Sequence, residues 1–474
     1  MAILDFSQYF FYRWRYIIGY SIVGLLLAGL LIFAGLYVPG GLSESEMAAV
    51  IQSQQLSYTN FNTLTVLNLP YHALQDGLLH LFGPSVFVIK LPSLIIGLAS
   101  ALGLIALLRR WFKPNIAVLS SLIAISTGQF LFMSQLGTPD VMFVFWPIVI
   151  LLLGTQVTRR RKHRALWKIL FGAAVALSLY TPLSIYTLIA IAITIGLHPH
   201  LRTAVRRLSI VRVGLSALIM SLLLLPLIVA AVQLPQTLMT LAGIPLETPN
   251  LIENAKLLIQ QYFVFWSPSA TNLITPVFSL GSFLIIILGI YRLIRTLDTT
   301  RSYLILTWII CLTPALLLNP SLTTVTFVPA VLLLAAGITS LIDYWYRLFP
   351  RNPYARITGL IPIIILVAAL IGSGVTRYVY GYHYSPQAVA LYSDDLKLIP
   401  DDTAELVVSE TEFPFYAAVF SYDEGIRVAT EASADTVVVS RGATSDLSAY
   451  QVEQIITNDR SEDANRFTIY SKNK

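Results

Sequence analysis

The amino-acid sequence predicts an all-α polytopic membrane protein with a small α/β domain at its C-terminal end. Of its 474 residues, 56% are hydrophobic and only 12% are charged, whereas soluble domains carry about 25% charged residues. Several apolar runs approach or exceed the roughly 18–20 residues that a membrane-spanning helix requires. Beyond residue 376 the composition changes to short β-type runs rich in acidic residues. Together these observations exclude a soluble globular protein as the class of the whole chain.

The first expected span, residues 16–37, resembles a signal sequence because Arg13 and Arg15 precede its apolar run. The run is long, and Pro39-Gly40-Gly41 follows it instead of a small-x-small cleavage site, so we expect a retained helix. Ten further spans bring the expected total to about 11 and place the two termini on opposite sides of the membrane. They are expected near residues 86–108, 115–134, 141–157, 167–181, 183–197, 213–234, 272–291, 303–318, 323–342 and 357–376.

The segment between the first two spans, about 38–85, is expected to carry two interfacial helices. Ser43-x-x-Glu46 before an apolar run is typical of a capping box that opens a helix. A second, amphipathic helix is expected from Tyr71 to Phe82, after Pro70 and before Gly83-Pro84.

Loop charge predicts the orientation in the plasma (inner) membrane. The loops assigned to the inside carry clusters of Arg and Lys, whereas the short loops on the other side hold almost none apart from Lys256. The positive-inside rule then places the N-terminus in the cytoplasm. The acidic sites and the C-terminal domain, residues 377–474, are therefore expected to be extracytoplasmic, outside the transmembrane domain 1–376.

Within the tail, four runs near 405–409, 425–429, 435–440 and 466–470 are expected to form strands. Helices are expected near 386–398 and 446–456. The net charge of +6 combines a basic membrane part with an acidic tail, so no nucleic-acid partner is implied. The single cysteine, Cys311, excludes a disulfide framework and a thiolate metal site.

Two acidic sites are expected on the outer face. Glu44 and Glu46 lie in Ser43-Glu44-Ser45-Glu46, where either carboxylate is a candidate general base. For Glu46 the alternative is the capping box, and an acid near a helix start is also favoured by the helix dipole. Asp140 lies in a short polar break between two apolar stretches. Carboxylates at the membrane boundary are costly and often functional, although Asp140 would also suit a helix start.

Four basic side chains are candidates for holding an anionic lipid substrate. Lys90 lies just inside the outer end of the second span, where it would otherwise extend its charge to the interface. Lys256 and Arg377 are the other outward cations, and His72 is a weaker candidate for which interfacial packing is the alternative. No phosphate-binding glycine loop, HExxH motif or nucleophile elbow is present.

Three stretches resemble the GT-C class of membrane glycosyltransferases, within it the protein O-mannosyltransferase and lipid A aminoarabinose transferase group. The first stretch, from Gly41, is an outer loop that opens with acids. The second runs from Pro70-Tyr-His-Ala-Leu to Leu81-Phe-Gly-Pro-Ser and places Lys90 at a family arginine position. The third, ending at Asp140, is similar to the second outer acid of the family. The likeness covers roughly the first 160 residues.

The resemblance implies an inverting glycosyltransferase that moves a sugar from a polyprenyl-phosphate donor to a protein, lipid or envelope glycan. Glu44 or Glu46 would deprotonate the acceptor, and Asp140 would orient the acceptor or bind a divalent metal ion such as Mg or Mn. The family pair Asp-Glu reads Ser45-Glu46 here, so Ser45 replaces the usual acid.

Two other classes remain open at this stage. One is a membrane transporter or lipid flippase, although such proteins usually place polar groups near the membrane midplane, often in paired halves. The other is a catalytically inactive relative that acts as a binding subunit, for which Ser45 is the main support.

Overall fold

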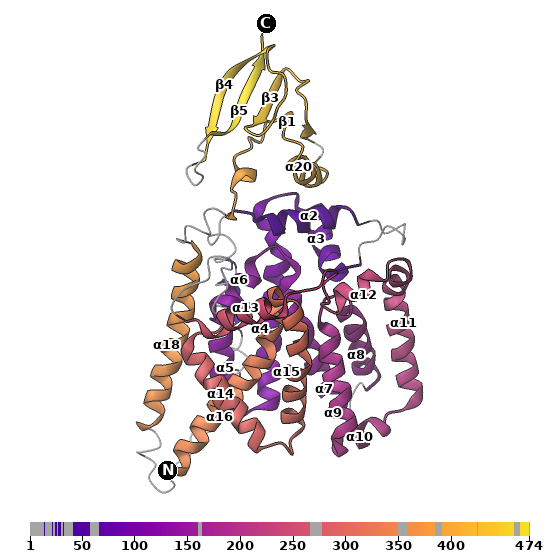
Figure 1. Ribbon diagram of the computed structural model, residues 1–474, viewed down its shortest axis with the longest axis vertical. Helices are drawn as coiled ribbons and strands as arrows, with labels where there is room; N and C mark the ends of the chain where they lie inside the picture. The colour runs from indigo at the N-terminus through magenta and orange to yellow at the C-terminus, as the bar shows by residue number, and fades with distance from the viewer. Residues whose placement is uncertain are drawn as a thin grey trace.

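The computed structural model describes residues 41–56, 66–159, 164–265, 277–348, 358–383, 391–423, 425–458 and 465–473, with a few isolated residues before 41 and Tyr354. A bundle of long helices occupies most of the molecule, and a small sheet domain stands at one end of it (Figure 1). Helices α2 (Glu44–Gln54) and α3 (Leu69–Phe82) lie between the bundle and the sheet (Figure 1). The expected first span, residues 16–37, falls almost wholly outside the described residues.

Helix α2 begins and helix α3 ends where the sequence predicts, while α3 begins at Leu69, two residues before the expected Tyr71. The Ser43 hydroxyl and the Glu46 side chain form the expected capping box at the start of α2. Helix α3 has Pro70 in its first turn and ends at Gly83, whose φ of 74° is a conformation that favours glycine. The expectation of two helices in this segment is therefore confirmed.

Most of the expected spans after the first coincide with helices. In the described part of the chain, six helices are long and apolar enough to cross a membrane, or up to eight if two bent pairs each count as one span. The predicted total of about 11 spans is not confirmed. The continuous candidates are α4 (Val86–Trp111), η2 with α7 (Pro139–Val141, Met142–Arg159), α11 (Ile210–Gln233), α15 (Thr300–Leu318), η3 with α16 (Pro320–Thr326, Phe327–Leu348) and α18 (Leu360–Tyr378).

The remaining helices are bent or short. Helices α5 (Pro114–Ile125) and α6 (Gly128–Gln135) meet at 61°, and α9 (Ser184–Leu197) and α10 (Pro199–Arg206) meet at 96°. The others in the bundle are α8 (Arg164–Ser178), α12 (Gln236–Leu241), α13 (Leu251–Phe263) and α14 (Leu280–Arg295). A short π-helical turn, η4 (Val379–His383), continues α18. Helices α8 and α14 fall in expected spans but are shorter than the roughly 20 residues that cross a bilayer without tilt.

The C-terminal domain contains a five-stranded sheet in the order β2-β1-β3-β5-β4. Strands β1, β2 and β3 run parallel, and β5 pairs antiparallel with both β3 and β4. The bounds are β1 (Glu405–Val407), β2 (Arg427–Ala429), β3 (Thr436–Ser440), β4 (Tyr450–Thr457) and β5 (Asn465–Lys472), with helices η5 (Asp395–Lys397) and α20 (Phe413–Phe420). The four expected strands are present.

One of the two helices expected in the tail needs correction. Residues 450–457 form strand β4 instead of a helix, because their β-branched side chains suit a strand and β5 supplies a complete antiparallel partner. Of the helix expected near 386–398, residues 386–390 lie outside the described residues; Leu391 is helical, and the short 3₁₀ turn η5 follows it. The sequence also gave no signal for α20, which packs against α2.

The sheet domain and the outer helices share a hydrophobic core. Leu42, Val50 and Leu79 cluster with Leu406 and Phe415 of the sheet domain. A backbone bridge joins Leu42 to Ser393, and the Tyr422 hydroxyl donates to Asp76 Oδ1 at 2.8 Å. The outer segment is therefore held between the bundle and the sheet and does not lie free at the membrane interface.

Candidate functional site

The carboxylate of Glu46 joins three segments of the chain. Its Oε1 atom lies 3.0 Å from Lys90 Nζ and accepts from the backbone N–H of Gly137 at 2.6 Å. Its Oε2 atom accepts from the backbone N–H of Ser43 at 2.9 Å and from the Ser43 hydroxyl at 3.0 Å. The side chain is completely buried. Both oxygens are thus engaged, and Glu46 fixes the outer loop, the start of α4 and the second acidic segment to one another.

Lys90 lies on the first turns of α4 and is also completely buried. Besides Glu46, it faces the ring of Tyr392, whose centroid is 5.6 Å from Nζ. Within the described residues, no acceptor meets the geometry of a hydrogen bond with the ammonium, which leaves N–H donors available. A buried charge is costly unless it is paired, so Lys90 and Glu46 each make the burial of the other tolerable.

The second acidic segment is fixed by hydrogen bonds to α4. Ser93, one turn after Lys90, donates its hydroxyl hydrogen to the Thr138 carbonyl at 3.1 Å. The hydroxyls of Tyr71 and Ser93 lie 2.9 Å apart. Asp140 follows in η2 with its side chain partly exposed. The short polar break therefore has a defined position beside the buried pair, with the Asp140 carboxylate at its end.

Both acidic segments affect the pKa of the Tyr71 phenol. Burial raises this pKa well above the usual range, and the negative charges of Glu46 and Asp140 raise it further. A hydrogen bond with Ser93 acts in the opposite direction. The carboxylates of Glu46 and Asp140 thus both lie close enough to act on one phenol.

Glu44 differs from Glu46 in its exposure to solvent. Its side chain is exposed in the first turn of α2, and Ser45 beside it is exposed as well. The Ser45 hydroxyl lies 3.0 Å from that of Ser43. Of the two glutamates in this segment, Glu44 is the one that a substrate can reach.

His72 lies below α2 in a buried polar network. Its Nδ1 atom is 2.9 Å from the Ser53 hydroxyl, which also donates to Gln75 Oε1 at 2.7 Å. Gln75 in turn donates to the Ile89 carbonyl at 3.0 Å. Burial lowers the pKa of His72 from 6.5 to about 4. A neutral imidazole in this position offers no positive charge to a phosphate, so His72 acts in packing α2 against α3.

The other two predicted cations lie on different helices. Lys256 is exposed on α13. Arg377 is partly buried near the end of α18, next to Tyr378, whose hydroxyl donates to Gln135 Oε1 beside the second acidic segment. The structure thus brings the outer end of α18 to the acidic segments but leaves Lys256 on the exposed surface of α13.

Among the residues that the structure describes, no three His, Cys, Asp or Glu side chains gather into a group that could hold a metal ion. One oxygen of Glu46 faces Lys90 and the other faces Ser43.

Sequence reasoning missed three residues that position this site. Gly137 lies in the polar break. An added Cβ there would lie 3.0 Å from the Ile89 carbonyl oxygen, and this tight fit is visible only in the folded protein. Ser93 and Tyr392 gave no signal, since a serine in an apolar helix and a tyrosine after a domain boundary are both common.

Comparisons with known proteins support the fold. Residues 69–229 match the model of the dolichyl-phosphate-mannose-protein mannosyltransferase family. No curated protein sequence matches the chain. ArnT from Cupriavidus metallidurans in the apo state is 13% identical with a TM-score of 0.52, over 96% of this chain and 98% of that one.

Two further structures have the same fold. ArnT from the same organism bound to undecaprenyl phosphate has a TM-score of 0.51 at 13% identity, over 95% of this chain and 98% of that one. The Archaeoglobus fulgidus oligosaccharyltransferase tethered to an acceptor peptide has a TM-score of 0.51 at 14% identity, over 88% of this chain and 64% of that one. The chain is therefore a multi-pass membrane protein with the fold of the GT-C glycosyltransferases, and its residues 69–229 carry the sequence pattern of the mannosyltransferase family.

Proposed function

We propose that the protein transfers a sugar from a polyprenyl-phosphate donor to a protein, lipid or envelope glycan acceptor. The observation that carries this proposal is the Glu46 carboxylate, which ties the first acidic segment to Lys90 and to Gly137 of the second. One face of the bundle thereby presents two acidic segments and a cation together. This is an arrangement suited to group transfer at a membrane surface.

In this proposal Glu44 is the general base. A sugar-acceptor hydroxyl is a weak nucleophile, and a carboxylate that removes its proton as the new bond forms accelerates the transfer. The acceptor oxygen bonds to the anomeric carbon, the bond from that carbon to the lipid phosphate breaks, and the configuration inverts. Asp140 orients the acceptor, and Glu46 positions both segments without exchanging a proton.

The departing lipid phosphate needs positive charge. Lys90 is completely buried against Glu46, whereas Arg377 comes to the same end of the bundle on α18 and is only partly buried. Charge-assisted hydrogen bonds to phosphate oxygens are the stronger kind. We assign the phosphate to Arg377, with Lys256 in a secondary role at the exposed rim, and Lys90 instead holds Glu46 in place. No step of the proposal uses a metal ion.

The structural neighbours support this substrate class. One ArnT structure holds undecaprenyl phosphate, and the oligosaccharyltransferase structure carries a tethered acceptor peptide. By the loop charges, the reaction would take place on the extracytoplasmic side of the plasma (inner) membrane.

Sugar transfer by the purified full-length chain in lipid tests the proposal, with polyprenyl-phosphate sugars as donors. We expect Glu44→Gln and Asp140→Asn each to lower turnover about a hundredfold or more while the protein stays folded. Glu410→Gln is a matched control, because Glu410 is the exposed second residue of Ser409-Glu410-Thr411-Glu412, where the Ser409 hydroxyl donates to Glu412 at 2.9 Å. Full activity in both test variants would contradict the assignment.

A catalytically inactive relative is the second candidate, and two observations favour it. Ser45 stands where the family has an acid, and Glu46 is fully engaged in holding the structure. Donor binding by the wild-type protein without turnover of any donor and acceptor pair would support a binding subunit instead of an enzyme.

A further inference from the structure

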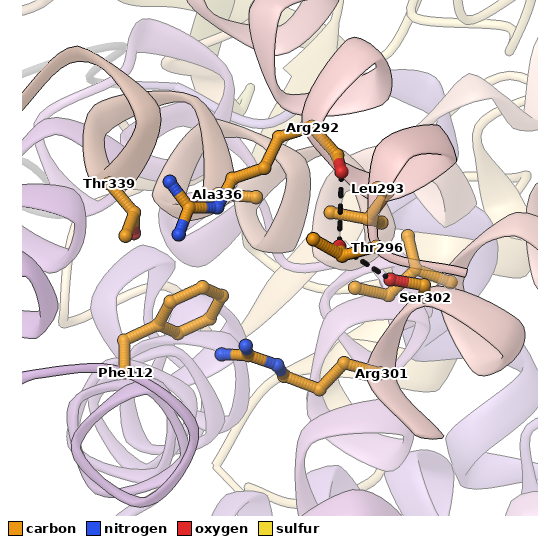
Figure 2. A pocket seen from close by; sticks show the side chains of 9 residues that line it. Phe112, Arg292, Leu293, Thr296, Arg301, Ser302, Ala336 and Thr339 are labelled. Carbon is orange, nitrogen blue, oxygen red and sulfur yellow. Dashed lines mark hydrogen bonds between the residues drawn. The ribbon is translucent and has the colours of Figure 1, made fainter. Parts of the chain in front are cut away.

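A small basic cavity lies where four helices of the bundle meet. It encloses about 20 Å³. The side chains of Arg292 and Arg301 run in the same direction and end on either side of the Phe112 ring in this view, with Thr339 near the guanidinium of Arg292 (Figure 2). Residues of α4's C-terminal cap, α14, α15 and α16 line it: Phe112, Arg292, Leu293, Thr296, Arg301, Ser302, Ile305, Ala336 and Thr339.

The cavity lies at the face of the bundle opposite to the acidic segments. Lys90 marks the acidic face, because it contacts Glu46. Phe112 follows Lys90 by 22 residues along α4 and its cap, which at 1.5 Å per residue is roughly 33 Å. The distance is close to the thickness of a bilayer's hydrocarbon core, about 30 Å. The cavity therefore lies at the level of the phospholipid head groups of the other leaflet.

Positive charge exceeds negative charge around the cavity. Asp343 pairs with Arg292 at 2.9 Å and with Lys113 at 3.4 Å. Arg301 has no carboxylate within ion-pair distance in the described part of the chain. Its guanidinium donates to the Trp111 carbonyl and lies over the Phe112 ring at 4.7 Å. One carboxylate thus balances three cations, and Arg301 is left without an anionic partner.

We propose that this cavity binds the phosphate group of an anionic phospholipid from the leaflet opposite to the acidic segments. Guanidinium groups bind phosphate oxygens through paired N–H donors, and two of them face one space here. Ser302 and Thr339 line the same space, but the Thr339 hydroxyl donates to the Ala335 carbonyl at 2.6 Å and the Ser302 hydroxyl lies 2.9 Å from that of Thr299. The guanidinium groups are therefore the donors that a phosphate would meet here.

The small volume of the cavity limits which part of a ligand can enter it. A space of about 20 Å³ holds one or two phosphate oxygens, since a single water needs about 10–15 Å³ by this measure. The rest of a head group, with its glycerol and acyl chains, must stay outside among the lipids. A phospholipid meets this condition because its phosphate sits at the end of chains that pack against the helices.

Native mass spectrometry of the detergent-purified full chain with dioleoylphosphatidylglycerol tests the site. We expect Arg301→Gln to weaken binding about tenfold or more. Arg295→Gln is the matched control: Arg295 lies on the same helix as Arg292, is exposed and stacks on Tyr291 at 5.0 Å. Because Arg301→Gln also removes the bond to Trp111, a second variant, Ala336→Val, fills the cavity and leaves both arginines in place.

Loss of lipid binding in Arg301→Gln and Ala336→Val, with binding retained in Arg295→Gln, supports the site. Equal binding in all variants, or equal affinity for zwitterionic dioleoylphosphatidylcholine, would overturn the assignment. Inorganic phosphate is the remaining probe. Thermal stabilisation of the wild type by millimolar inorganic phosphate, absent in Arg301→Gln, would assign the site to the free anion and refute the lipid.

Discussion

The carboxylate of Glu46 lies 3.0 Å from the ammonium of Lys90, and both side chains are completely buried. This pair lies where the outer segment, α4 and the second acidic segment meet. Glu46, one of the two candidate bases, is therefore buried with both oxygens engaged, and in our proposal catalysis falls to the exposed Glu44.

Removing one member of this pair should destabilise the protein strongly. We expect Lys90→Met to lower the free energy of unfolding by about 3–5 kcal/mol, because it leaves a buried carboxylate without its counter-charge. The double variant Lys90→Met with Glu46→Gln should recover part of that loss. Thermal unfolding in detergent measures the difference.

The exposed pair of Lys397 and Asp394, 3.3 Å apart, is the control for that prediction. Lys397→Met should cost about 1 kcal/mol or less, as expected of a solvent-exposed ion pair. A double variant of the buried pair that is less stable than Lys90→Met would show that the two charges do not compensate each other.

Replacing Gly137 by alanine should destabilise the protein, because an added Cβ meets close neighbours. In Gly137→Ala the new Cβ would lie 3.0 Å from the Ile89 carbonyl oxygen and 3.1 Å from Glu46 Oε1, so one of these contacts must shift. We expect lower stability and lower turnover together.

Gly77→Ala in α3 is the comparison, because nothing lies within 4 Å of its added Cβ. A helical Gly→Ala change there should stabilise by about 0.5–1 kcal/mol. Unchanged stability and turnover in Gly137→Ala would disprove the tight fit.

His72 should make stability depend on pH. Burial lowers its pKa from 6.5 to about 4. Between pH 6.5 and pH 4 this histidine is therefore protonated in the unfolded chain but not in the folded chain. Stability is therefore lost as the pH falls from 6.5 toward 4, by up to about 3 kcal/mol for this group. Melting temperatures of the wild type and His72→Gln between pH 4.5 and 7.5 measure the effect. The difference between the two should change across this window, and parallel curves would contradict the prediction.

The sheet domain should lie on the extracytoplasmic side. It packs on α2 and α3, at the end of the bundle that carries the acidic segments. A reporter that functions only outside the cytoplasm, fused after Lys474, should be active. The control is the same reporter inserted in the basic stretch after α10, near Arg207, which should be inactive. The reverse pattern would invert the topology and move the proposed chemistry to the cytoplasmic side.

The sequence by itself determined the features that depend on local composition. Apolar runs placed the helices α4, α11 and α16, because transfer into lipid depends on the hydropathy of one contiguous segment. The Ser43 and Glu46 capping box was predictable for the same reason, since its two residues are neighbours on one turn. Four of the five strands followed from β-branched runs between turn residues, and the three matched stretches indicated the GT-C fold.

Only the tertiary structure decided which polar groups meet. Glu46, Lys90 and Gly137 are far apart in sequence, and no local pattern shows that one carboxylate binds both of the others. The same holds for β4, which is a strand because β5 lies beside it to pair with its backbone. His72 and Glu46 were both candidates for contact with a substrate, and both are buried in the folded protein. Burial is a property of the packed molecule, and it separates a carboxylate that holds segments together from one that can accept a proton.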